Sequence, residues 1–142
     1  MLANLRKLRA LRSSQLQLLA ACCVLVPIVD ISLRLVGMRR TKGLLVRFDG
    51  SRHRVRIGAE LEPIEIGRLV SIAATHSLWR ASCLRQALVL WWLLARRGIS
   101  TDIRLGVSVA SDDSLDAHAW IEHNGEVIIG GQASLERFRV IL

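Results

Sequence analysis

A nearly unbroken apolar stretch from Ala87 to Ala95 restricts the folding of this chain more than any other feature. A helix that is apolar on most sides must lie in the centre of a domain, with other elements packed around it. Arg96 and Arg97 complement the C-terminal end of its dipole, and Gly98 favours a left-handed stop. We therefore expect a buried central helix that begins at Cys83 and ends at Arg97.

A thiol at the start of a helix and a histidine in a later strand are typical of enzymes that attack acyl groups. The positive end of the helix dipole at Cys83 stabilises a thiolate, and a nearby imidazole holds the proton. His118, in the strand-like segment 116–122, is the candidate for that base. In the alternative interpretation, Cys83 is a small buried hydrophobe and His118 an ordinary strand histidine.

Alternating patterns after the helix predict a small antiparallel sheet. Residues 103–109 alternate apolar with small or polar side chains, and a turn cluster at 111–114 separates them from the His118 strand. Asn124-Gly125 is a strong signal for a two-residue hairpin turn. Counting outward from that turn, His123 pairs with Glu126 and His118 lies opposite Gly131.

The two faces of the His118 strand differ in character. His118, Trp120 and Glu122 share one face, and three aliphatic residues share the other. We expect the aliphatic face to pack in a core and the His118 face to meet the Cys83 helix.

The N-terminal apolar segment is expected to form a buried helix from about Ser14 to Leu25. Pro27 blocks simple continuation, so a second short helical piece would follow to Val36. The uncharged run, residues 16–29, is shorter than the roughly twenty residues of a spanning helix. An interfacial membrane helix with arginines on both flanks is the competing interpretation.

The stretch from Thr41 to Pro63 is ambiguous. Residues 44–57 fit a hairpin about Asp49-Gly50, and a helix followed by a loop fits nearly as well. After Pro63, the apolar spacing predicts a helix that ends near residue 79.

Length and composition favour a single domain over residues 1–142, with an apolar helical segment at 1–40 and a catalytic region at 64–142. The chain is 51% hydrophobic, which allows one core. Its net charge of +8 comes almost wholly from arginine and suits an acidic partner. With two Phe and no Tyr, the sequence offers few aromatic side chains for stacking on bases, which weakens the case for nucleic-acid binding. Three cysteines and four histidines without metal-ligand spacing predict no disulfide framework, no metal and no cofactor, in a reducing, cytoplasmic setting.

Three segments together resemble a known family. Residues 79–88 (WRASCLRQAL), 93–99 (LLARRGI) and 117–122 (AHAWIE) are similar to those of the transglutaminase-like leader peptidases of lasso-peptide biosynthesis, often called B2 proteins. The resemblance runs from about Ile64 to the C-terminus and more loosely over the N-terminal segment. It implies an α+β, transglutaminase-like or papain-like fold with the Cys-bearing helix on a small antiparallel sheet.

The same resemblance implies an activity and partners. Such a cysteine protease removes the leader from a ribosomally made precursor, and a separate cyclase closes the freed amine onto a side-chain carboxylate. Some members carry a fused leader-recognition domain, for which these 142 residues leave no room, so a stand-alone recognition protein is expected. A transglutaminase-like acyltransferase and a non-enzymatic basic adaptor at a peptide or membrane surface remain as alternatives.

The chain departs from the family pattern after His118. Many relatives carry an Asp about twelve positions later, where this chain has Gly130. Gln132, Asp116 or a backbone carbonyl is expected to orient the imidazole instead. Gly130→Asp keeps or improves activity if the backbone tolerates a side chain, and clashes if the Cys83 helix or the substrate approaches closely.

The remaining site residues concern the oxyanion and the substrate. The backbone N–H of Cys83 is expected to donate to the oxyanion, with Trp79 or Gln86 as a second donor. Both also have structural interpretations, Trp79 as a core residue and Gln86 as a solvent-facing one. Trp120 is expected to contact the substrate.

Overall fold

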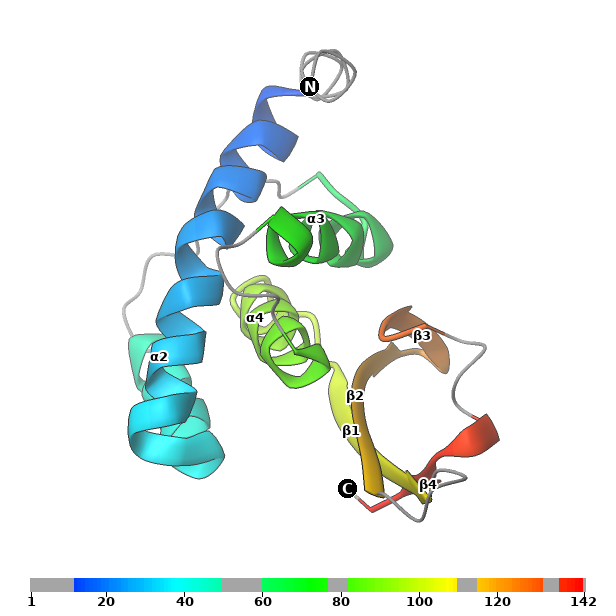
Figure 1. Ribbon diagram of the computed structural model, residues 1–142. Coiled ribbons are helices and arrows are strands. Elements are labelled where there is room, and N and C mark those ends of the chain that lie inside the picture. Colours follow the sequence, from blue (N-terminus) through cyan, green and yellow to red (C-terminus); the bar gives the residue numbers. More distant parts are fainter. Residues whose placement is uncertain (1–11, 50–59, 77–81, 110–114, 132–135, 142) are drawn as a thin grey trace.

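A computed structural model describes residues 12–49, 60–76, 82–109, 115–131 and 136–141. Figure 1 shows helices on one side of a small curled sheet. The helices are α2 (Ser13–Asp49), α3 (Pro63–His76) and α4 (Cys83–Ala95). The strands are β1 (Asp102–Val109), β2 (Leu115–His123), β3 (Glu126–Ile129) and β4 (Arg139–Val140), in the order β3-β2-β1-β4. All three strand pairings are antiparallel, which confirms an α+β arrangement.

Helix α4 lies at the centre, as its apolar stretch predicts. It packs against α2 and α3 on one side and against β2 and β1 on the other. Residues 87–90 of α4 are completely buried. The helix ends at Ala95, and the chain turns through Gly98 at a φ of 74°.

Helix α2 differs from the expectation of two short pieces. Its first helical part continues through Pro27, and Gly37, whose backbone is non-helical with φ of 77° and ψ of 172°, separates it from a second helical part. The carbonyl that loses its partner at Pro27 belongs to Cys23, an exposed residue, so water can satisfy it. The helix continues to Asp49, which confirms a helix rather than a hairpin for residues 44–49; residues 50–57 lie outside the described part.

The length of α2 bears on whether it could cross a membrane, although its uncharged run is still residues 16–29. Within the described residues, Ser13–Arg47 is the one helix whose length and composition would allow it to cross a bilayer. Its inner face is nevertheless part of the core, through Leu18, Cys22, Val26 and Val29.

The turn of the hairpin between β2 and β3 is as predicted, but beyond the turn the pairing register of the two strands is shifted by one residue. Asn124 and Gly125 have φ of 52° and 80°, and His123 pairs with Glu126. A bulge then places Ile121 opposite Ile129, one residue further along β3 than regular pairing from the turn would give. His118 therefore does not pair with Gly131, and the paired part of β3 ends before it reaches the first half of β2.

Candidate functional site

Cys83 is the first residue of α4 and is half-buried against the core. Ser82 precedes it as the N-cap, in an extended conformation, and makes no side-chain capping hydrogen bond. The first turn of α4 contains no acidic side chain. A thiol at this end of the helix therefore lies in the positive field of the dipole, beside backbone N–H groups that the Ser82 hydroxyl does not use.

The other two cysteines lie on α2. Cys22 is completely buried, and desolvation, with a smaller contribution from Cys23, raises its pKa to about 12, although Arg97 acts in the opposite direction. Cys22 is thus a neutral core residue at physiological pH. Cys23 is exposed near the middle of a helix and has no terminal dipole beside it.

The His118 ring is held by a backbone carbonyl. Its Nε2 lies 2.6 Å from the carbonyl oxygen of Gly130. Because a carbonyl oxygen only accepts, the proton of the neutral ring must be on Nε2, and Nδ1 is then the basic nitrogen. Of the three predicted orienters, the structure thus supports a backbone carbonyl, that of Gly130.

Gly130 must be glycine for a reason that differs from both predicted ones. Its φ is 110°, and a Cβ there would lie 2.5 Å from the Cβ of Trp120. The close neighbour is therefore Trp120 on the adjacent strand, and neither the Cys83 helix nor a substrate is needed to explain the glycine. An Asp at this position would have no space, so the condition under which Gly130→Asp keeps activity is not met and the alternative of a clash applies, with Trp120 as the neighbour.

Two aromatic residues enclose the His118 ring. Its centroid lies 6.2 Å from that of Trp120 and 5.1 Å from that of Phe138. Trp120 is completely buried, and its indole N–H donates to Glu122 at 2.7 Å. A side chain so buried packs against the catalytic candidate and does not present a surface to a substrate. Sequence analysis missed Phe138, because nothing local to residue 138 indicates that it reaches a strand twenty residues away.

The prediction that the His118 face meets α4 is wrong. The core around α4 includes Ala119 and Ile121, which lie on the opposite face of β2 from His118 and Trp120. Small aliphatic residues allow a helix to approach a sheet closely, whereas the large rings are covered by Phe138 and by the curl of the sheet.

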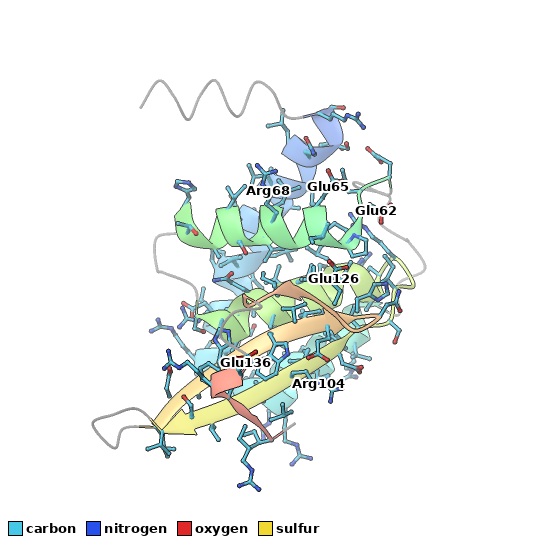
Figure 2. The ribbon with its side chains drawn as sticks, turned by 90° about the vertical axis from the view of Figure 1, so that its right-hand side faces the viewer. Glu62, Glu65, Arg68, Arg104, Glu126 and Glu136 are labelled. Atoms are coloured by element: carbon cyan, nitrogen blue, oxygen red, sulfur yellow. The ribbon has the colours of Figure 1, made fainter. Side chains whose placement is uncertain are left out.

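Cys83 and His118 nevertheless lie toward the same end of the domain. Strand β1 leaves the C-terminal end of α4 and β2 returns beside it, so β2 runs in the direction of α4. From that common end, the five strand residues back to His118 extend about 16 Å. The thirteen residues of α4 back to Cys83 extend about 20 Å. In Figure 2 the first turn of α4 and the start of β2 both lie at the left.

Within the described residues, His118 hydrogen-bonds Gly130 and not Cys83. Strand β3 pairs with residues 121–123 of β2, and Gly130 then lies beside Trp120, where a Cβ on it would be 3.1 Å from the Ala119 carbonyl oxygen. His118 faces away from α4, whereas Cys83 packs against the core on the α4 side, so the two side chains lie on opposite sides of β2 in this structure. Catalytic hydrogen bonds often tighten only when substrate binds.

A buried ion pair fixes the first turn of α4. Asp30, in the core-facing side of α2, accepts a hydrogen bond from Arg85 Nε at 2.8 Å, and Arg34 Nε lies 3.1 Å from the same oxygen. The Asp30 side chain is 3% exposed. Arg85 is two residues after Cys83, so this pair determines where the first turn lies relative to α2.

The other predicted site residues are placed as follows. Gln86 faces α3, where its carbonyl oxygen accepts a hydrogen bond from the Ser71 hydroxyl at 3.3 Å. Asp116 is exposed on β2 and pairs with Ser108. Trp79 and Gln132 lie outside the described residues. No group of three or more His, Cys, Asp or Glu side chains suited to a metal occurs in the described part of the chain.

The comparison with protein families identifies the domain. A family model described as the transglutaminase-like superfamily matches residues 24–142. The chain belongs to the transglutaminase-like superfamily. This superfamily consists generally of cysteine-based enzymes and includes both proteases and acyltransferases. No curated protein and no solved structure matched the chain in the other two comparisons.

Proposed function

We propose that this protein is a cysteine peptidase that removes the leader from a ribosomally made lasso-peptide precursor. The observation that carries the proposal is the position of Cys83, at the uncapped first turn of the central helix of a transglutaminase-like domain. The resemblance of the segments around Cys83 and His118 to lasso-peptide leader peptidases supplies the substrate class.

The proposed reaction has two steps. The Cys83 thiol transfers its proton to Nδ1 of His118 and attacks the carbonyl at the junction of leader and core. The C–N bond breaks, the departing amine takes the proton from His118, and the leader remains as a thioester. His118 then removes a proton from water, which hydrolyses the thioester and regenerates the thiol. First-turn N–H groups of α4 would hold the oxyanion in both steps.

The Gly130 carbonyl has a defined role in this scheme. It keeps the Nε2 proton in place, so the nitrogen that exchanges protons with the thiol is always Nδ1. A neutral carbonyl also stabilises the imidazolium less than a carboxylate would. We therefore expect a slower enzyme than relatives with an Asp, acting in the cytoplasm with a stand-alone recognition protein and a cyclase as partners.

The test is cleavage of the precursor, followed by mass spectrometry, with and without the recognition protein. Cys83→Ala and His118→Ala should abolish cleavage, and Cys22→Ala and Cys23→Ala serve as matched thiol controls that retain it. Faster cleavage with the recognition protein would support a raised effective concentration of precursor. Equal cleavage by all three cysteine variants would refute the nucleophile, and products joined to an amine in place of water would indicate an acyltransferase.

A further inference from the structure

The outer face of α2 carries an apolar stripe that no described element covers. Val24, Ile28, Ile31 and Leu35 follow one another at intervals of four, three and four residues, which places them on one side of the helix. They are 61%, 51%, 48% and 78% exposed. In Figure 1, α3 and α4 lie on the same side of the first part of α2. A stripe of this kind on a soluble surface normally marks an interaction site.

The charged residues of α2 that follow the stripe are cations. Beyond Gly37 the exposed ones are Arg39, Arg40, Arg47 and Lys42, whose Nζ lies over the Trp91 ring, whereas Arg34 is paired with Asp30 and Arg12 lies near the Glu60 carboxylate. The only carboxylate among residues 12–47 is Asp30, which is buried and paired with Arg34 and Arg85. The partner should therefore combine a negatively charged surface with an apolar layer beneath it.

A second copy of the chain fits this description poorly. Pairing two α2 helices through the stripe would bring the two sets of arginines together, and like charges oppose such contact. The stripe is also aliphatic, without the aromatic anchors that are enriched in protein interfaces. An anionic bilayer offers both the charge and the apolar layer.

The packing of α2 decides how it would meet a bilayer. Although the helix is long and apolar enough to cross one, its inner face is buried in the core and Asp30 ties its middle to α4. Spanning would break those contacts, whereas lying in the plane of the surface keeps them. We propose that α2 docks the domain on anionic membranes, with the stripe in the headgroup and acyl boundary and the cations beside the lipid phosphates.

This proposal is independent of the peptidase assignment and is tested by sedimentation with lipid vesicles. The intact protein should bind vesicles of equal parts phosphatidylglycerol and phosphatidylcholine, and bind vesicles of phosphatidylcholine alone much less. Added salt should weaken the binding, because the attraction to the charged surface is screened. Arg39→Ala and Arg40→Ala should each lower affinity about fivefold.

Replacing apolar residues by Asp distinguishes specific binding through the stripe from nonspecific hydrophobic adsorption. The double variant Val24→Asp with Leu35→Asp should lower vesicle binding at least about tenfold. The matched control is Val109→Asp with Leu115→Asp, which changes two equally exposed apolar residues on the sheet and should leave binding unchanged. Circular dichroism should show all variants folded, as the positions are exposed.

Three results would overturn the proposal. The first is absence of binding to anionic vesicles, and the second is an equal loss in the stripe and control variants. The third is a wild-type dimer in light scattering that the stripe variant converts to a monomer, because the face would then bind a second copy.

Discussion

At the scale of single residues, a backbone carbonyl and not a side chain holds the ring of the histidine. A side-chain carboxylate can be replaced by mutation, but the Gly130 carbonyl belongs to the backbone and depends on a φ that other residues rarely adopt. The orientation of His118 is therefore set by the conformation of the chain at Gly130. Any change that moves this peptide should affect activity through the ring.

Gly130→Ala tests this dependence. The added methyl group must approach Trp120 and adopt a positive φ, so we expect a loss of about 2 to 3 kcal/mol of unfolding free energy in urea denaturation. Cleavage should fall in parallel, because the carbonyl that holds His118 moves. The matched control is Gly98→Ala, where φ is 74° and no atom lies within 4 Å of the new Cβ; it should lose only about 1 kcal/mol. Equal losses would mean that backbone strain alone, without the contact to Trp120, explains the effect.

The burial of Cys22 makes the free energy of unfolding depend on pH, and the sign of this dependence follows from the raised pKa of the thiol. Its pKa is about 12 in the folded protein, against an ordinary value of 9.0. Below pH 9 the Cys22 thiol is protonated in both the folded and the unfolded chain, so the free energy of unfolding does not depend on its titration there and is at its highest. As pH rises from 9 toward 12 the unfolded chain loses the proton first, and stability falls by up to about 1.4 kcal/mol per pH unit.

The measurement is urea denaturation of the wild type and Cys22→Ala as pH is raised. The difference between the two proteins should be constant below pH 9 and should shrink above it, because the variant lacks the titrating thiol. Parallel curves over the alkaline range would show that Cys22 does not titrate in this way.

At the scale of elements, the central helix and the hairpin turn were predictable because their signals are local. A continuous apolar stretch and the Asn124-Gly125 pair specify α4 and its neighbouring hairpin without reference to the rest of the chain. Helix α2 was not predictable in this way. Pro27 is a strong local signal for interruption, and the contacts of Cys22 and Val26 with the core outweigh it.

The Asp30–Arg85 pair shows what joins these elements. Asp30→Asn should destabilise the fold by about 2 to 4 kcal/mol, because Arg85 keeps its charge in a mostly buried position and loses the carboxylate. Arg34 contacts the same oxygen but is 61% exposed, so Arg34→Ala should cost about 0.5 kcal/mol or less. Urea denaturation of both variants provides the comparison. A similar loss of unfolding free energy in the two variants would show that the pair between Asp30 and Arg85 does not stabilise the fold more than the exposed pair between Asp30 and Arg34.

At the scale of the whole molecule, the site depends on contacts that no local pattern contains. Cys83 and His118 could be named from the sequence, and the ring contacts of His118 with Phe138 could not. The side of the sheet occupied by His118 was also predicted wrongly. Alternation shows which residues share a face, but only the packing of α4 against Ala119 and Ile121 determines which face the helix covers.

Native-state alkylation of the three thiols tests the arrangement across the molecule. With iodoacetamide at neutral pH and mass spectrometry of the peptides, Cys22 should remain unmodified until the protein unfolds, because it is completely buried and neutral. Exposed Cys23 should react at the rate of an ordinary thiol. Cys83 should react faster than Cys23, since it lies at the N-terminus of α4, whereas Cys23 lies within a helix.

His118→Ala makes the experiment specific for the proposed pair. Labelling of Cys83 should slow several-fold, because the imidazole that takes the thiol proton is gone, whereas labelling of Cys23 should not change and so serves as an internal control. If Cys83 reacts no faster than Cys23 and is indifferent to His118→Ala, the thiol is structural. The domain would then be an adaptor that keeps the transglutaminase-like fold without its chemistry.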